Sequence, residues 1–494
     1  MLQKRNIPAI DDLLRDEPER RFEMVRTAHG WRLDLGALPL PLAAWRQAHA
    51  LGPVAALNEA VQALFAARIV NPSEARPALH MALRAADPRT ICSDADAQCV
   101  LAARERLLQT AEAWYRGSTP VRHLLHIGIG GSDLGPRLVA DALDPGDSAV
   151  QVHWLSTLDE RRLTRLLSEL APEHTAVLVA SKSFATRETL LQAGRVREWM
   201  GADASARLWA ATARPDAATG FGVPPEHVLA FPDWTGGRFS LWSGVGLGAA
   251  ARIGPARWQA LLDGAAQADR AFRDAPANGL PAAFALAIDA LVRGAGFGTL
   301  GVISYAPELR LLAAHLQQLL MESLGKSVDV DGRPVDAPTA PLVFGGVGTD
   351  MQHSLFQALH QGTARHPVLL VGAAEGADGA TKWRREQLAH LLAQARVLVH
   401  GADDARPERK LPGGNPVMTL LARRIEPASL GALLADLEHA VYVVATRWRI
   451  NAFDQWGVEE GKRLALRVRS ALDEGAETGD PMLDATLAWL HTGR

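Results

Sequence analysis

From about residue 121 onwards, short apolar runs alternate with stretches in which apolar residues recur every three or four positions. The first pattern is typical of a buried strand and the second of an amphipathic helix. Three such strand–helix units follow one another, with glycine or polar turns between them. They are 121–127 with 134–143, 150–155 with about 159–170, and 176–180 with about 185–200. Alternation of this kind predicts a parallel sheet covered by helices.

A second alternating block follows an Ala-rich helical stretch over about 255–295, which looks like a domain boundary. We expect polar, Gly- and Pro-rich loops at 376–379 and 401–414. Residues 1 to about 115 show helical periodicity without convincing strands. The strand candidates of the second block are 299–304, 341–344, 367–371, 395–400 and 417–422. The pattern therefore predicts an α/β protein with two unequal domains and a helical N-terminal arm.

Composition narrows the class of protein. A chain of 494 residues with 48% hydrophobic residues is long and apolar enough for two domain-sized cores. The formal charge of −3 and the lack of a basic block argue against nucleic acid as a partner. We find no signal-peptide pattern and no apolar stretch of membrane-spanning length, so we expect a cytoplasmic protein without membrane contact. Cys92 and Cys99 lack metal or redox spacing.

Lysine is rare, because only six of the 52 basic residues are lysines and the other 46 are arginines. Each lysine is a candidate for a role that suits a compact ammonium group better than a planar guanidinium, although chance is the alternative. The six are Lys4, Lys182, Lys326, Lys382, Lys410 and Lys462.

Two turns of the first block are candidates for phosphate binding. Residues 128–133, Gly-Ile-Gly-Gly-Ser-Asp, join a predicted strand to a helix, where free backbone N–H groups attract anions. Asp133 replaces the third glycine of a dinucleotide fingerprint, and no P-loop lysine follows. A tight turn that needs glycine is the alternative.

The second turn, 181–189, follows the strand at 176–180 and carries four hydroxyls and Lys182. One hydroxyl suffices to cap a helix, so this set is better explained by a phosphomonoester at the carboxyl end of a parallel strand. The hydroxyls belong to Ser181, Ser183, Thr186 and Thr189.

Candidate acid–base chemistry lies in the second block. Residues 307–325 predict one helix, with a proline in its first turn and a glycine at its C-terminal end. Gln318 and Glu322 share one face, and a buried Glu322 would have a raised pKa, which suits a base for a carbon-bound proton. A solvated surface carboxylate is the alternative.

A further helix is expected through His360, capped by Thr349 or Asp350. It would place His353 near a helix N-terminus, where the imidazole stays neutral and able both to give and to take a proton. His360 is predicted to be a packing or capping residue. We find no HExxH, CxxC or GxSxG motif and no zinc-ligand pattern, which argues against those common chemistries and predicts no metal.

Seven blocks, spread over most of the chain, resemble the phosphoglucose isomerase family, also called glucose-6-phosphate isomerases. The fourth, fifth and seventh are highly specific as a combination. The blocks are Asn71–Arg84, His126–Pro136, Ser181–Thr189, Gly236–Gly246, Gln317–Lys326, Gly348–Thr363 and Ile450–Lys462.

The resemblance implies an aldose–ketose isomerase that acts on glucose 6-phosphate and fructose 6-phosphate through a cis-enediol, without cofactor. It implies Glu322 as the base, Arg238 as the group that stabilises the enediolate, and His353 and Lys462 as residues of ring opening. Glu188 falls where a carboxylate can orient the histidine. The implied phosphate and substrate contacts are Gly131, Ser132, Ser181, Lys182, Ser183, Thr186, Gly237, Gln318 and Gln455.

The resemblance also implies two sugar-isomerase-type domains, each a mainly parallel sheet flanked by helices, in a homodimer whose active-site histidine comes from the partner subunit. The expected segments are an arm at 1–115, a smaller domain at 116–255, a helical connection at 256–295, a larger domain at 296–475 and a helical tail at 476–494.

The chain departs from the family pattern at Leu324, Gly346–Val347 and Asp350–Met351, and more mildly at Ser183 and Ala185. All proposed catalytic side chains survive these changes, which bear on substrate preference and ring opening rather than on the reaction. The alternatives are an isomerase that also accepts mannose 6-phosphate and a sugar-phosphate-sensing regulator. A regulator would need the phosphate turn without Glu322 or Lys462.

Overall fold

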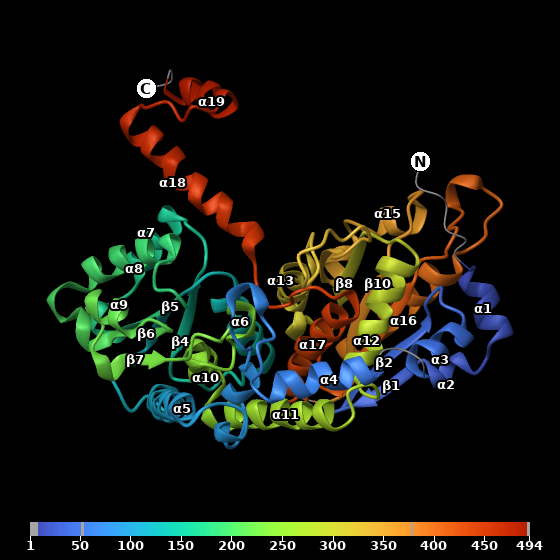
Figure 1. Ribbon diagram of the computed structural model, residues 1–494, viewed down its shortest axis with the longest axis horizontal. Coiled ribbons are helices and arrows are strands. Elements are labelled where there is room, and N and C mark those ends of the chain that lie inside the picture. Colours follow the sequence, from blue (N-terminus) through green and yellow to red (C-terminus); the bar gives the residue numbers. More distant parts are fainter. Residues whose placement is uncertain (1–7, 51–53, 377–378, 492–494) are drawn as a thin grey trace. The chain divides into compact units, whose positions relative to one another are not determined.

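The structure is a computed structural model that describes residues 8–50, 54–376 and 379–491. The chain divides into two compact units, Met1–Ala452 and Phe453–Arg494. The first unit contains two sheets, as predicted, and Figure 1 labels many of their strands and helices. The predicted segment boundaries inside this unit stay predictions.

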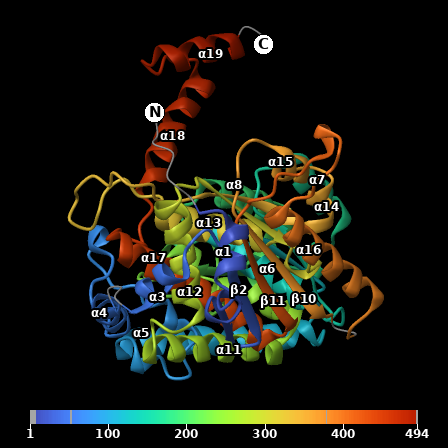
Figure 2. The same cartoon turned by 90° about the vertical axis from the view of Figure 1, so that its right-hand side faces the viewer.

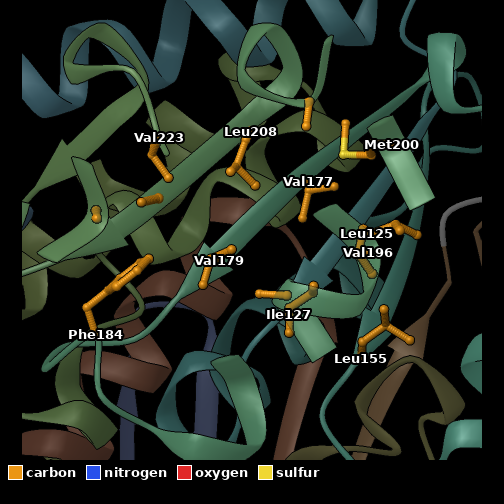
Figure 3. Packing of buried hydrophobic residues seen from close by; sticks show 14 of the residues in the cluster. Leu125, Ile127, Leu155, Val177, Val179, Phe184, Val196, Met200, Leu208 and Val223 are labelled. Atoms are coloured by element: carbon orange, nitrogen blue, oxygen red, sulfur yellow. The ribbon is translucent and has the colours of Figure 1, made fainter. Parts of the chain in front are cut away.

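The first sheet has five parallel strands in the order β4-β3-β5-β6-β7. Its central strand β5 is buried along its whole length, and such a strand is covered on both faces by helices. Figure 3 shows Leu125, Val177 and Leu208 from three neighbouring strands in one apolar cluster with Val196 of a covering helix. The strands are β3 (His123–Ile127), β4 (Gln151–Leu155), β5 (Thr175–Ala180), β6 (Leu208–Thr212) and β7 (Val228–Ala230).

Helices follow the strands of this sheet as the periodicity predicts. The three predicted strand–helix units are confirmed, and the helix predicted at 134–143 has those bounds. The helices are α6 (Leu134–Leu143), α7 (Glu160–Glu169), α8 (Arg187–Met200) and α9 (Pro215–Gly220).

The second sheet has six strands in the order β1-β2-β11-β10-β8-β9 (Figure 2 shows β2, β11 and β10). Strands β8 to β11 are parallel, whereas β2 pairs antiparallel with β11 and β1 pairs antiparallel with β2. Four of the five predicted strands are confirmed. The strands are β1 (Val25–Ala28), β2 (Trp31–Ala37), β8 (Thr299–Ser304), β9 (Leu342–Val347), β10 (Val368–Glu375) and β11 (Val417–Arg424).

Two expectations for this sheet are wrong. The first 115 residues are not wholly helical, because β1 and β2 extend the sheet and Trp31, Leu33 and Leu35 enter its core. Residues 395–400 are not a strand but the end of helix α16 (Lys382–His400), which packs on β10 and β11 and buries Leu398 and Val399. Thr381 caps that helix by accepting a hydrogen bond from the Arg384 N–H, so the helix begins well before the β-branched residues.

A late helix of the first unit packs against two successive helices from much earlier in the chain. Helix α17 (Pro427–Trp448) packs against α11 (Pro255–Asp274) and α12 (Leu280–Asp289). Among the described residues, α17 alone has the length and apolar composition of a membrane span, and 89% of that window is buried inside the fold. The burial accounts for its composition.

Further helices complete the two units. In the second unit α18 (Glu459–Glu474) ends at Gly475, which adopts the left-handed conformation of a C-cap, and α19 (Pro481–His491) follows. The remaining helices of the first unit are α1 (Ile10–Asp16), α2 (Arg20–Glu23), α3 (Leu42–Ala50), α4 (Val54–Phe65), α5 (Asp94–Tyr115), α10 (Leu247–Ile253), α13 (Leu312–Leu324), α14 (Gly348–Gln352) and α15 (Phe356–Gln361).

Candidate active site

Arg238 is the centre of the candidate site. It lies in a short 3-10 turn, η8 (Gly237–Phe239), and only 4% of the residue is exposed. Its Nε–H donates to Ser323 Oγ at 2.7 Å, an Nη1–H donates to Glu322 Oε2 at 3.2 Å, and Nη2–H donates to the Ala452 carbonyl. These contacts fix a buried cation beside the end of α13.

Glu322 lies in the last turn of α13, and its side chain remains 30% exposed. Its two oxygens have different partners, because Oε1 accepts from Gln318 Nε2 at 3.2 Å and Oε2 accepts from Arg238. The predicted shared face of Gln318 and Glu322 is therefore confirmed. The carboxylate is only partly buried, so it combines a fixed cationic partner with an opening to a ligand.

The helix that carries Glu322 differs from the prediction at both ends. The predicted helix 307–325 is a 3-10 turn, η11 (Pro307–Leu309), followed by α13 from Leu312. Gly325 has φ −74° and does not adopt the left-handed C-cap conformation. The ammonium of Lys326 instead donates to the Glu322 carbonyl at 2.7 Å, so a cation satisfies a carbonyl that the helix end leaves open.

The glycine turn after β3 lies directly against these residues. A Cβ built on Gly131 would lie 2.0 Å from the Gly237 carbonyl oxygen, and one on Gly130 would lie 2.9 Å from Gln318 Nε2. Gly130 also has φ +58°. Only glycine permits this approach, so the turn brings Gly131 to both Gly237 and the α13 face.

Ser132 lies at the end of that turn, and a buried histidine holds its backbone carbonyl. The ring of His126 on β3 lies 2.7 Å from the Ser132 carbonyl oxygen. Burial lowers the pKa of His126 to about 4, so the ring is neutral and its Nε2–H donates to the carbonyl. His126 thus supports the candidate phosphate turn.

The hydroxyl turn lies at the carboxyl end of β5, as predicted. Ser181 is buried, and its Oγ lies 3.0 Å from Thr186 Oγ1. Thr186 is the N-cap residue of α8, but its side chain makes no capping hydrogen bond. Ser183 is exposed, and its Oγ accepts from the Ala185 N–H at 3.3 Å. The capping alternative therefore does not explain Thr186.

Lys182 lies between the two serines and is mostly buried. Its Nζ lies 3.6 Å from Asp233 Oδ1, in the loop after β7. Burial, aided by the nearby Arg76 charge, lowers the pKa of Lys182 to about 8.

His353 is not near a helix N-terminus, which corrects the prediction. The expected helix through His360 is divided into α14 and α15, and His353 follows the C-terminal end of α14. Val347 is the N-cap, and neither Thr349 nor Asp350 caps the helix through its side chain. The helix-dipole argument for His353 therefore fails, because that argument requires the first turn of a helix.

The ring of His353 is exposed in the short link between the two helices. Within the described part of the chain it takes no part in the hydrogen bonds that join Arg238, Glu322 and Gln318. His360, by contrast, donates its Nε2–H to Gln394 Oε1 on α16 at 2.7 Å, consistent with its predicted packing role.

The departures from the family pattern are accommodated locally. Leu324 is fully buried in the core beneath α13. The Met351 side chain lies over Gly346, because a Cβ built on that glycine would meet the Met351 methyl carbon at 3.3 Å. These side chains fill space with apolar groups at the positions where the sequence differs.

Two predicted residues belong to the second unit. Lys462 is exposed in the first turn of α18, and its Nζ lies 2.8 Å from Glu459 Oε1. Gln455 is half-buried and precedes a 3-10 turn, η13 (Trp456–Val458), whose last N–H donates to the Gln455 carbonyl.

Sequence reasoning missed the groups that hold the candidate residues in place. Ser323 adjoins Glu322 and could have been noted as a polar neighbour, but no sequence signal identifies the Ala452 carbonyl as a partner of Arg238. Asp233 pairs with Lys182, and its one sequence signal is that it directly precedes the run Trp-Thr-Gly-Gly-Arg, which ends at Arg238. Among the described residues, no three His, Cys, Asp or Glu side chains form a metal-binding group.

The chain is similar to known proteins over almost its whole length. The chain is 41% identical to a glucose-6-phosphate isomerase of Xanthomonas campestris pv. campestris (strain B100), over 98% of this chain and 96% of that protein. It is 42% identical to the enzyme of the same name from Stenotrophomonas maltophilia (strain K279a), with the same coverage of 98% and 96%.

A crystal structure of a glucose-6-phosphate isomerase from Chlamydia trachomatis superposes with a TM-score of 0.87 at 28% identity, covering 99% of this chain and 97% of that one. A hypothetical protein from Thermus thermophilus gives 0.68 at 26% identity, covering 88% and 99%. The family described as phosphoglucose isomerase matches residues 45–486. The chain belongs to the phosphoglucose isomerase family.

Proposed function

We propose that this chain interconverts glucose 6-phosphate and fructose 6-phosphate, a reaction of glycolysis and gluconeogenesis, in the cytoplasm. Family membership supports the reaction. The observation that carries the assignment is the partly open Glu322 carboxylate, held at 3.2 Å by the buried Arg238 guanidinium.

Glu322 acts as the base in this proposal. Its carboxylate takes the proton from C2 of the open-chain aldose, and the C–H electron pair forms the C1–C2 double bond while charge moves to the carbonyl oxygen. The proton of the C2 hydroxyl passes to the C1 oxygen in the cis-enediol intermediate. The same carboxylic acid then returns its proton to C1 while the C2 oxygen becomes the carbonyl, which gives the ketose. Arg238 supplies a fixed positive charge for the enediolate, and a preorganised cation in a buried site stabilises such charge more than water does.

The phosphate is assigned to the two turns at the carboxyl edge of the first sheet. Ser181, Ser183 and Thr186 offer hydroxyls, and Lys182 offers a charge. Gly131 and Ser132 lie on the adjoining turn, and the contact of Gly131 with Gly237 links that turn to Arg238. Gln318, which already donates to Glu322, is assigned to the sugar.

Ring opening is assigned to His353 and Lys462, with Gln455 as a further substrate contact. His353 is exposed and outside the Arg238–Glu322 hydrogen bonds of its own chain, which supports a homodimer in which each histidine serves the partner's site. Mixing inactive His353→Ala and inactive Glu322→Gln subunits tests this arrangement. Activity regained in hybrid dimers is the expected result, and no recovery after verified subunit exchange would assign each site to one chain.

The function itself is tested by a coupled assay with fructose 6-phosphate in the presence of EDTA. We expect full activity, because side chains supply the base, the cation and the proton donors. Activity that EDTA abolishes and a divalent ion restores would overturn the proposed mechanism. Mannose 6-phosphate as substrate in the same assay resolves the dual-specificity alternative, and binding without turnover would favour the sensing alternative.

A further inference from the structure

Three cationic side chains converge on one carboxylate beside the hydroxyl turn. Lys182 Nζ lies 3.6 Å from Asp233 Oδ1, Arg214 Nη2–H donates to Asp233 Oδ2 at 3.2 Å, and Arg76 Nη1 lies 3.4 Å from Oδ1. Three of these residues follow the ends of β5, β6 and β7. The cluster therefore lies at the carboxyl edge of a parallel sheet, where open α/β folds bind their ligands.

Backbone hydrogen bonds hold the cluster together. The Ala213 N–H and the Thr212 hydroxyl both donate to the Lys182 carbonyl at 3.0 Å. Arg76 Nη1–H also donates to the Asp233 carbonyl at 2.9 Å. Lys182 and Arg214 thus project from the ends of β5 and β6, and Arg76 is held beside them by its hydrogen bond to the Asp233 carbonyl.

Positive charge exceeds negative charge in this cluster. Glu74 pairs with Arg76 at 2.5 Å, so three cations face two carboxylates. Asp233 is 48% exposed, and its neighbours Lys182 and Arg76 are more buried than it is. The lowered pKa of Lys182, to which the Arg76 charge contributes after burial, is consistent with incomplete neutralisation.

The cluster adjoins the turn assigned to the substrate phosphate, because Lys182 belongs to both. A phosphate on Ser181 and Thr186 would lie next to Lys182, and a second anionic group attached to it would face Arg214 and Arg76. That group would replace the exposed Asp233 carboxylate as their counterion. A monophosphate sugar has no such second group.

We propose that Lys182, Arg76 and Arg214 form a second anion subsite beside the phosphate turn, which binds ligands with two adjacent anionic groups and makes diphosphates competitive inhibitors. The proposal rests on the proposed function only for the place of the first phosphate. Asp233 occupies the subsite as an internal anion when no such ligand is bound.

The test compares inorganic phosphate with pyrophosphate as inhibitors of fructose 6-phosphate turnover, in EDTA and at constant ionic strength. We expect pyrophosphate to have the lower inhibition constant. Arg214→Gln is expected to reduce the ratio of the phosphate inhibition constant to the pyrophosphate inhibition constant by about tenfold, which is the usual contribution of one charge-assisted hydrogen bond. KM for fructose 6-phosphate is expected to stay within about twofold of the wild-type value. Asp233→Asn, which removes the competing anion, is expected to tighten pyrophosphate binding.

Arg165→Gln is the matched control, because Arg165 lies on α7 of the same sheet's flank, is 82% exposed and pairs with Glu169. It lowers the net charge equally and is expected to leave the ratio unchanged. An unchanged ratio in Arg214→Gln, or an equal change in Arg165→Gln, would overturn the subsite.

Calorimetric titration of pyrophosphate into the full chain separates this proposal from the proposed function. If the chain did not isomerise fructose 6-phosphate, tighter pyrophosphate binding by the wild type than by Arg214→Gln would still support the subsite. Equal binding by the two proteins, together with normal isomerase activity, would overturn the subsite alone.

Discussion

Two arginines of the first unit are almost completely buried against carboxylates, but the carboxylates differ in their access to solvent. Arg84, in the segment after the 3-10 turn η2 (His80–Leu83), donates to both oxygens of Asp269 at 2.8 and 2.7 Å and also to Glu438. Both of these acids are buried. Arg238 is similarly buried, but its partner Glu322 keeps 30% of its side chain exposed. We call the first group the closed cluster and the second the open pair.

Each charged side chain of the closed cluster has partners from the protein itself. The Arg84 guanidinium lies 4.6 Å from the ring centroid of Trp242, whose Nε1–H donates to Glu438 Oε1 at 2.9 Å. Asp269 Oδ1 also lies 2.7 Å from His439 Nε2. Such a cluster joins α11, α17 and the segment that precedes α5, and no member is presented to a ligand.

The difference teaches that the strength of an arginine–carboxylate contact does not separate a structural cluster from a reactive one. The two kinds of contact differ in whether the carboxylate remains accessible to solvent and to a ligand. The closed cluster resists loss of its arginine, because removal of Arg84 leaves two buried carboxylates without their cation. An open carboxylate beside a buried cation can exchange its proton with a bound substrate, which general base catalysis requires.

The largest expected effect falls on the open pair. Glu322→Gln preserves the size and one hydrogen-bonding oxygen but removes the base, so kcat should fall by about 10² to 10⁴. The free energy of unfolding should change little, because the side chain is partly exposed. Exchange of the substrate's C2 proton with solvent reads out the step directly, and wild-type exchange in this variant would exclude Glu322 as the base.

The closed cluster should show the opposite result. Arg84→Met leaves Asp269 and Glu438 buried without their cation, so the free energy of unfolding should fall by about 3 to 5 kcal/mol, as measured by denaturant titration. Glu17→Gln, which removes the charged partner of the buried Arg20, is the control and should cost less because Glu17 is partly exposed. A loss confined to kcat, with normal stability, would contradict the comparison.

The pH dependence of stability should sharpen the same contrast. One arginine serves two buried carboxylates, so burial raises the pKa of Glu438 to about 7. Burial acts on Asp269 as well, but Arg84 and His439 outweigh it and hold the pKa of Asp269 below its usual range. For Glu438, a raised folded-state pKa gives stability that is present below the unfolded value near 4.3 and is lost as pH rises through about 7.

Glu438→Gln mimics the protonated acid and removes that loss. The stability of the variant relative to the wild type should therefore rise between about pH 4.5 and 7, by on the order of 2 kcal/mol. Denaturant titrations at a series of pH values measure the rise. Parallel pH profiles for the two proteins would mean that Glu438 is ionised throughout this range.

The smallest expected effect concerns the uncharged hydroxyls of the open region. Replacing Ser181 and Thr186 with Ala should raise KM by a factor that corresponds to about 1 to 2 kcal/mol of binding free energy for the pair, because two neutral donors to a phosphate are lost. The values of kcat and stability should change little. Steady-state kinetics with fructose 6-phosphate measure both constants. An unchanged KM would place the phosphate elsewhere, and a large loss of stability would give these hydroxyls a structural role.

Local sequence pattern determined much of the fold. The strand at 299–304 and the helix at 134–143 have their predicted bounds, because their apolar periodicity is set by neighbours within a few residues. The same holds for Gln318 and Glu322, which share a face because they are four residues apart on one helix. The glycine and hydroxyl turns were also visible, since strand ends and turn residues mark them in the sequence.

Tertiary structure decided what depends on distant partners. Strands β1 and β2 look unconvincing alone, and β2 exists as a sheet strand because β11, nearly four hundred positions later, offers it an edge. Residues 395–400 have strand-like composition, but packing of α16 on the second sheet keeps them helical. The closed cluster joins residues 185 and 354 positions apart, and the open pair joins residues 84 apart. Local pattern carries no record of such pairings, and burial by the whole fold decides which carboxylate stays open.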